Sequence, residues 1–216
     1  MDTVKVGVGE IINEMIEVGR ANLPLLALTT LAIVAGFSLL DMVSSSASNS
    51  INLVVTIFVQ YQVVERMLAD RVPSEPRKHR YGAMFIAGLL GGLATLVGFV
   101  LLIVPGLFLL AAWSATTPFI VVEDKSGTGA LAASWHATAA SRVPLMLVVL
   151  LGSALLAAGF TALFLFAGIS DDSMSLVATV FVNLLATVVT VAGWVLGVAV
   201  YRLVVPYSGR FKEVFA

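Results

Sequence analysis

Residues 83–122 read AMFIAGLLGGLATLVGFVLLIVPGLFLLAAWSATTPFIVV, and these 40 residues contain no Asp, Glu, Lys, Arg or His. A helix needs about 20 mostly apolar residues to cross the hydrocarbon core of a bilayer. The run is therefore long enough for two crossings. Pro105-Gly106 divides it, and this dipeptide is a strong turn signal. The sequence predicts a hairpin of two membrane-spanning helices here.

The composition of the whole chain agrees with a membrane protein. Of its 216 residues, 59% are hydrophobic and 12% are charged, and the mean hydropathy is +1.03. A soluble domain has about 45–50% apolar and about 25% charged residues, so this chain has too few charges to cover a water-exposed surface. A net charge of −1 argues against a nucleic-acid partner. The absence of cysteine excludes disulfides and thiolate metal sites.

The hydropathy pattern predicts one all-α membrane domain over residues 1–216, a polytopic helical bundle with six transmembrane helices and two amphipathic interfacial helices. A polar turn is expected at 44–49, between the first two crossings. The helix at 1–20 suits the membrane boundary, but it suits packing on the protein's own cytoplasmic face equally well. The expected order is an amphipathic helix at 1–20, two crossings at 21–69, a basic cytoplasmic loop at 70–82, two crossings at 83–122, an interfacial helix at 123–142, two crossings at 143–205 and a cytoplasmic tail at 206–216.

The placement of charge predicts the orientation. With both termini in the cytoplasm, the outer connections of six crossings are residues 41–50, 104–107 and 168–174. These connections contain three aspartates and no lysine or arginine, so all twelve basic residues fall on the cytoplasmic side. The positive-inside rule expects this bias over short loops. We therefore expect a multi-pass protein with both termini cytoplasmic.

Catalytic and metal sites are not expected. The central thirds of the six segments contain no Asp, Glu, Lys, Arg or His, although intramembrane chemistry usually depends on such groups. His79 lies in the proline-containing basic loop and His136 has no acidic residue three or four positions away, so no metal ligand set is predicted. An intramembrane enzyme would need Glu65, Glu123 and a histidine to converge. We expect no enzyme, no cofactor and no metal.

Small residues four positions apart occur in three of the predicted crossings. This spacing places two small residues on one helix face, where another backbone can approach closely. We expect these residues to allow close packing between helices of this chain. Packing against a second protein is the less frequent use of such pairs. They are Gly88 and Gly92, Gly193 and Gly197, and the looser pair Ala32 and Gly36.

Four amide side chains lie within the predicted crossings, and two interpretations are open for them. They are Asn52, Gln60, Gln62 and Asn183. They can line a polar groove, or they can form the hydrogen bonds between helices that hold a membrane bundle together, which is the commoner case.

Residues 105–142 read PGLFLLAAWSATTPFIVVEDKSGTGALAASWHATAASR. This stretch resembles the YciC-like inner-membrane proteins and the membrane domain that accompanies some glycerophosphodiester phosphodiesterases. The resemblance is carried by residues of structural type: Pro105, Gly106, Pro118, Glu123, Ser134 and Trp135. It implies six crossings with two surface helices. Phosphodiesterase activity is not carried over, because fewer than 15 residues follow the last predicted segment.

The expected function is that of a non-catalytic protein of the bacterial inner (cytoplasmic) membrane. It would be a scaffold or accessory subunit of the envelope that contacts membrane lipids. We also expect a protein partner in the membrane, either another membrane protein or a second copy of this chain. The alternative is a transporter or flippase-like carrier of an apolar or amphipathic substrate. A carrier predicts that Gln60 and Gln62 face a cavity, whereas a scaffold predicts that they bond to neighbouring helices.

Overall fold

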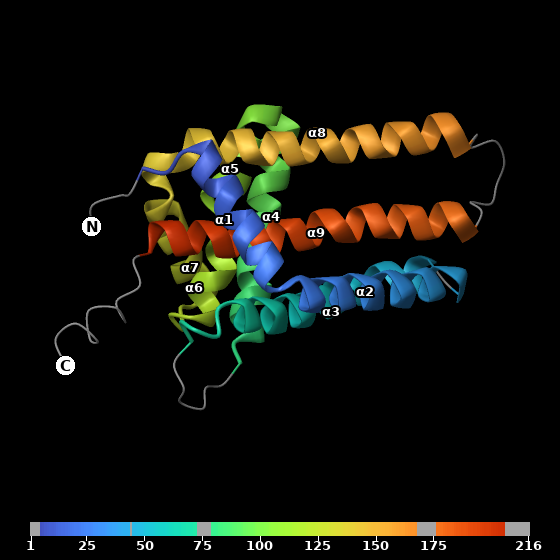
Figure 1. Ribbon diagram of the computed structural model, residues 1–216, viewed down its shortest axis with the longest axis horizontal. Helices are drawn as coiled ribbons and strands as arrows, with labels where there is room; N and C mark the ends of the chain where they lie inside the picture. Colours follow the sequence, from blue (N-terminus) through green and yellow to red (C-terminus); the bar gives the residue numbers. More distant parts are fainter. Residues whose placement is uncertain (1–4, 44, 73–78, 168–175, 206–216) are drawn as a thin grey trace.

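The computed structural model describes residues 5–43, 45–72, 79–167 and 176–205, which form α-helices and no strand (Figure 1). The predicted all-α class is confirmed over these ranges. The tail at 206–216, the connection at 168–174 and residues 73–78 of the basic loop lie outside the described residues. The helices are α1 Val8–Ala21, α2 Leu23–Val43, α3 Ser45–Met67, α4 Tyr81–Leu101, α5 Ile103–Ala112, α6 Thr116–Val121, α7 Gly127–Ala137, α8 Arg142–Ala167 and α9 Leu176–Val204, with a 3-10 turn at Ala139–Ser141.

Four long helices set the shape of the molecule. α2, α3, α8 and α9 run along its long axis, and α3 returns beside α2 (Figure 1). α4 runs across these helices instead of along them. It lies near the end of the molecule where α1 begins and α9 ends (Figure 1). The shorter helices α5, α6 and α7 gather at this same end, where they pack around α4 and the last turns of α9.

The surface of the long helices is apolar and exposed, as expected for contact with lipid. Leu28 is 69% exposed, Leu155 is 66% exposed and Val177 is 77% exposed. Within the described residues, five stretches are long and apolar enough to cross a bilayer: Leu23–Asp41, Tyr81–Leu101, Ile103–Val121, Ala139–Ala162 and Val177–Val204. The chain is thus a multi-pass membrane protein by the length and composition of its helices. Six crossings remain a prediction, because the more polar α3 is not one of these five.

The amphipathic helix α1 packs on the protein itself. Its apolar side chains Ile11 and Val18 are each 1% exposed, and the helix lies against α8 and α9. Glu10 accepts a hydrogen bond of 2.7 Å from the backbone N–H of Gly7, which satisfies one of the donors that a helix start leaves free. α1 therefore covers other helices of the protein, and its position at the membrane boundary stays a prediction.

Three local boundaries differ from the prediction. α3 begins at Ser45, so residues 45–49 are helical instead of forming a polar turn. The hairpin turns at Leu102 and not at Pro105-Gly106, because α5 begins at Ile103 and a proline is tolerated in the first turn of a helix. The predicted fourth crossing is two helices, α5 and α6, with a break at residues 113–115.

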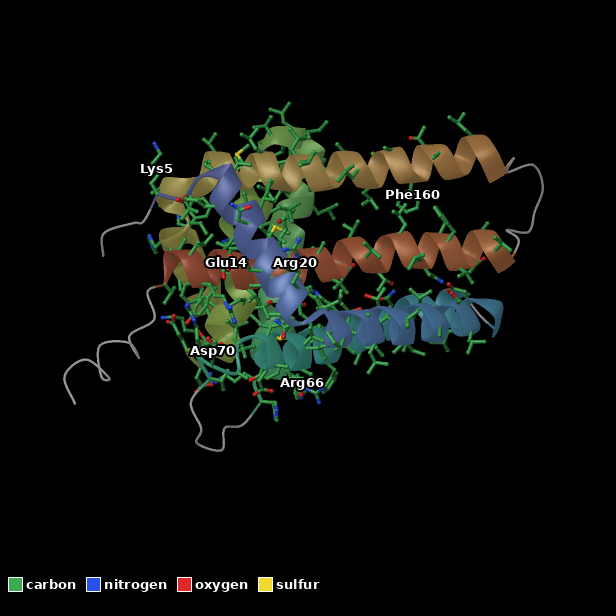
Figure 2. All side chains as sticks on the ribbon, in the orientation of Figure 1. Lys5, Glu14, Arg20, Arg66, Asp70 and Phe160 are labelled. Carbon is green, nitrogen blue, oxygen red and sulfur yellow. The ribbon has the colours of Figure 1, made fainter. Side chains whose placement is uncertain are left out.

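The charged side chains gather at the end of the molecule that carries α1 and the last turn of α9. Figure 2 labels Lys5, Glu14, Arg66 and Asp70 in this region, whereas Phe160 lies in the long-helix part. This grouping agrees with the charge bias in the sequence, since basic residues from distant segments come together on one side.

Candidate functional site

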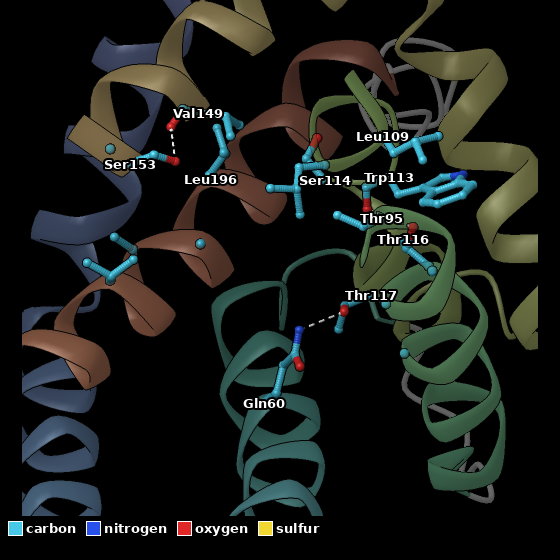
Figure 3. Close-up of a pocket in the computed structure, with 18 of the residues that line it drawn as sticks. Gln60, Thr95, Leu109, Trp113, Ser114, Thr116, Thr117, Val149, Ser153 and Leu196 are labelled. Atoms are coloured by element: carbon cyan, nitrogen blue, oxygen red, sulfur yellow. Dashed lines mark hydrogen bonds between the residues drawn. The ribbon is translucent and has the colours of Figure 1, made fainter. Parts of the chain in front are cut away.

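A cavity of about 760 Å³ lies where α4 crosses the long helices (Figure 3). Its walls come mainly from α3, α4, α5, α6, α8 and α9, with one residue each from α1 and α7, and its lining is mainly apolar. No Asp, Glu, Lys, Arg or His among the described residues lines it. Its volume falls within the range of about 300–1,000 Å³ that is usual for small-molecule sites. The cavity is therefore the leading candidate for a binding site.

The break between α5 and α6 forms part of the cavity wall. Proline has no N–H, so Pro118 cannot bond to the carbonyl of Ser114 one turn earlier. Local hydroxyl groups bond to other carbonyls at the break: Ser114 Oγ donates to Ala111 O at 2.9 Å and Thr116 Oγ1 donates to Trp113 O at 2.7 Å. Such side-chain bonds allow an irregular backbone to exist in an apolar environment.

Several glycines at the cavity have unused space beside them. A Cβ atom added to Gly88, Gly92, Gly152 or Gly193 would meet no heavy atom within 4 Å, and all four residues line the cavity. In contrast, a Cβ on Gly197 would lie 2.6 Å from the carbonyl oxygen of Ser114. Glycine therefore permits close packing at Gly197, whereas at the other four positions it leaves the cavity wide.

These contacts differ from the packing role predicted for the small-residue pairs. Of the five glycines in those pairs, Gly197 has close neighbours, while Gly36, Gly88, Gly92 and Gly193 have none within 4 Å of an added Cβ among the described residues. Ala32 is exposed. The physical reason is that the spacing creates a flat face but does not place a second helix on it. Packing of these residues against another protein stays a prediction.

Gln60 and Gln62 face different surroundings. Gln60 lines the cavity, and its Nε2 donates to Thr117 Oγ1 at 2.8 Å (Figure 3). Gln62 donates from Nε2 to the hydroxyl oxygen of Tyr81 at 2.9 Å. It lines a separate groove of about 290 Å³ between α2 and α3. Each glutamine therefore both lines a hollow and bonds to a neighbouring helix, so the carrier and the scaffold both stay predictions.

The two asparagines lie outside the cavity. Asn183 Nδ2 bridges from α9 to α2, donating to Ser38 Oγ at 3.1 Å and to Asp41 Oδ2 at 2.9 Å. Asn52 Oδ1 accepts from Thr56 Oγ1 at 2.8 Å, one turn along the same helix. The four amides thus do not form one groove: Gln60 lines the cavity and Asn183 joins two helices.

The residues that carry the family resemblance have structural contacts. Pro118 is fully buried, and Gly106 lies so close to the ring of Phe99 that an added Cβ would be 2.5 Å from it. Ser134 Oγ donates to Ala112 O at 2.8 Å. The ring of Trp135 lies under the guanidinium of Arg142, 4.1 Å from its centroid. These contacts hold α5, α6, α7 and the start of α8 together beside the cavity.

Glu65 and Glu123 belong to separate ion pairs. Glu65 Oε2 lies 3.6 Å from His79 Nε2, whereas Glu123 Oε1 accepts from the hydroxyl of Tyr201 at 3.1 Å and its Oε2 pairs with Lys125 at 3.2 Å. Neither glutamate lines the cavity. Across the described ranges, no group of three His, Cys, Asp or Glu side chains is placed to hold a metal ion.

A second charged group joins α1, α3 and α9 at the same end. Arg202 donates to Met67 O at 2.9 Å and lies 3.4 Å from Asp70 and 3.9 Å from Glu14. Nearby, burial and then the positive charge of Arg202 lower the pKa of the Arg71 guanidinium, which stays protonated at neutral pH because of its high intrinsic basicity. These contacts are structural and do not involve the cavity.

Sequence reasoning did not identify Thr117, Trp113 and Gly152 as cavity residues. One signal was available for the first two, because a proline within a helix removes the hydrogen bond to the carbonyl four residues earlier and its ring clashes with that carbonyl. A helix break was therefore predictable one turn before that proline. Nothing in the local sequence distinguished Gly152 from other glycines.

The chain matches no family model, no curated protein and no solved structure. The resemblance to YciC-like proteins and to the phosphodiesterase-associated membrane domain therefore stays a prediction.

Proposed function

We propose that this chain is a non-catalytic protein of the bacterial cytoplasmic membrane that binds a lipid in the cavity beside α4, with both termini in the cytoplasm. The observation that carries the proposal is the cavity itself, about 760 Å³ with a mainly apolar lining. Ligand sites are typically apolar with a few convergent polar groups. Here the polar groups come from Gln60 and from the break between α5 and α6.

The surroundings of the cavity support a lipid occupant. The cavity is partly open at the surface of the helices and its lining is mainly apolar, and apolar surface is most stable against an apolar partner. In a membrane, the molecules at hand to fill an apolar cavity are lipids. The lining therefore favours a lipid occupant.

The four open glycines support the same proposal. Glycine within a helix costs about 0.5–1 kcal/mol relative to alanine. Gly88, Gly92, Gly152 and Gly193 have no compensating close contact within the described chain, yet all four line the cavity. Larger side chains at these positions would project into its space. A ligand that fills this space would account for glycine, and not a larger residue, at these four positions.

We also propose that the α4–α5 hairpin lies in the inner leaflet and forms one wall of the cavity. α4 runs across the long helices (Figure 1). The two ends of the segment that contains the hairpin meet through the Arg80–Asp124 ion pair. The charge rule is satisfied equally by a crossing and by a non-crossing hairpin, because residues 104–107 carry no charge. Four crossings, by α2, α3, α8 and α9, would then replace the six expected.

A scaffold or accessory subunit is the second candidate, and two contacts favour it. Asn183 joins α9 to α2, and Gln62 joins α3 to the start of α4. Both amides hold helices together, as the scaffold interpretation predicts. A scaffold does not by itself account for the cavity, so lipid binding is the function that the geometry supports better.

The test is gentle extraction of the native protein followed by mass spectrometry of the bound molecules. Gly152→Leu and Gly193→Leu would each place a side chain in the cavity. Gly36→Leu is the matched control, because Gly36 also has no neighbour within 4 Å of an added Cβ but does not line the cavity. We expect the wild type and the control to retain a stoichiometric lipid and the two cavity variants to lose it.

Equal lipid retention by all four proteins would contradict the proposal. A stoichiometric protein partner without a retained lipid would establish the scaffold instead. Thermal melting of each variant separates loss of the ligand from loss of the fold.

A further inference from the structure

We infer that the occupant of the cavity is an uncharged lipid with a free hydroxyl group, of the diacylglycerol class, and that Gln60 and Thr117 bind this hydroxyl. The inference rests on the proposed lipid-binding function and adds the chemical class of the ligand. It is carried by the charge of the lining and by the unused hydrogen-bonding capacity of one pair of side chains.

The lining provides no partner for a charged headgroup. Among the described residues at the cavity, there is no Lys, Arg or His to bind a phosphate and no Asp or Glu to bind an amine. A charge is strongly disfavoured in an apolar site unless it is paired. Arg202 and Arg80 are engaged in ion pairs outside the cavity. The part of the ligand inside the cavity is therefore uncharged.

Gln60 and Thr117 have the complementary groups that a hydroxyl needs. Gln60 Nε2 donates to Thr117 Oγ1 at 2.8 Å, which leaves the amide oxygen of Gln60 free to accept and the hydroxyl of Thr117 free to donate with respect to the described residues. A ligand hydroxyl can donate to the first group and accept from the second. A fully esterified lipid has acceptors only, so it can form just one of these two bonds.

Three other hydroxyl groups at the cavity are already engaged. Ser114, Thr116 and Ser153 each donate to a carbonyl three or four residues earlier in the chain, at 2.7–2.9 Å. The dashed lines in Figure 3 mark the Gln60–Thr117 bond and the Ser153–Val149 bond on opposite sides of the cavity. Thr95 also lines the cavity, but a lone hydroxyl lacks the adjacent amide oxygen that the Gln60–Thr117 pair provides, so this pair is better placed to select a ligand.

The experiment measures binding of three lipid probes to the purified full-length chain by native mass spectrometry. Dioleoylglycerol is uncharged and has one free hydroxyl, trioleoylglycerol is uncharged and has none, and dioleoylphosphatidylglycerol carries a charged headgroup. We expect dioleoylglycerol to bind about tenfold more tightly than trioleoylglycerol, which cannot donate to Gln60 and so forms one hydrogen bond fewer. We expect it also to bind more tightly than phosphatidylglycerol, whose charge finds no partner in the lining.

The test variant is the double substitution Gln60→Leu with Thr117→Val. Replacing both partners of a hydrogen bond by apolar groups of similar shape is often nearly neutral for stability, so the fold should persist. We expect this variant to lose the preference for dioleoylglycerol over trioleoylglycerol while it still binds both lipids. Ser153→Ala is the matched control, because its hydroxyl lines the cavity but is bonded to Val149 O at 2.9 Å.

The outcomes separate the inference from the proposed function. If phosphatidylglycerol or trioleoylglycerol binds as tightly as dioleoylglycerol, or if the double variant keeps the preference, the hydroxyl-binding inference is overturned while lipid binding stands. If no probe binds and Gly193→Leu changes no lipid retention, the proposed function fails and the inference fails with it.

Discussion

The pair Gly193 and Gly197 provides a direct comparison of two glycines that share one sequence motif. A Cβ on Gly197 would lie 2.6 Å from the carbonyl oxygen of Ser114, whereas a Cβ on Gly193 would have no heavy atom within 4 Å. Close carbon–oxygen contacts in proteins are about 3.3–3.6 Å. Gly197→Ala therefore requires a shift of about 0.7 Å or more between α9 and the backbone at the α5–α6 break.

The cost of this shift can be separated from the change in helix propensity. Overpacking of a tight interior costs about 1–3 kcal/mol. Replacing glycine by alanine in a helix contributes about 0.8–1.0 kcal/mol of stability, and this gain is common to both substitutions. Gly197→Ala should therefore unfold more easily than Gly193→Ala by about 1–3 kcal/mol. Gly193→Ala should be as stable as the wild type or more stable.

The assay is reversible unfolding of the two variants and the wild type in mixed detergent micelles, followed by circular dichroism at several denaturant concentrations. The free energies of unfolding of the two variants are compared under identical conditions. Equal stabilities, or a greater loss in Gly193→Ala, would refute the assignment of Gly197 to packing and of Gly193 to open space.

Two further predictions concern the wall of the cavity. Ser134→Ala should cost about 1 kcal/mol of stability in the same unfolding assay, because the carbonyl of Ala112 loses the hydrogen bond from the Ser134 hydroxyl; a loss above about 3 kcal/mol would contradict this account. Single spin labels on cysteines at Phe85, Leu93 and Leu101, all exposed on α4, should report similar depths in the bilayer. A crossing hairpin would instead place the middle label about 12 Å deeper than the other two, since α-helices rise about 1.5 Å per residue.

Several features of this protein follow from the sequence alone because they depend on local composition. The all-α class and the membrane environment follow from long apolar stretches such as residues 83–122. In an apolar solvent the backbone must satisfy its own hydrogen bonds, and helices do so within one segment. The grouping of basic residues at one end also follows, since the chain alternates between basic and uncharged or acidic connections.

The tertiary structure decided which small and polar residues act at the cavity. GxxxG spacing places two glycines on one face, but the neighbouring backbone at the α5–α6 break determines that Gly197 is packed and Gly193 is open. The same holds for the amides, of which Gln60 lines the cavity while Asn183 joins two helices. Such roles depend on segments far apart in the chain, and no local pattern records them.

The direction of the α4–α5 hairpin is likewise a tertiary property. Hydropathy measures how apolar a helix is, and a helix lying in a leaflet can be as apolar as one that crosses the membrane. The charge rule depends on the connections, and residues 104–107 contain no charge that would favour either placement. The packing of α4 against α5 and α7 fixes the angle of α4 to the long helices, and the proposed placement of the hairpin in one leaflet rests on this angle.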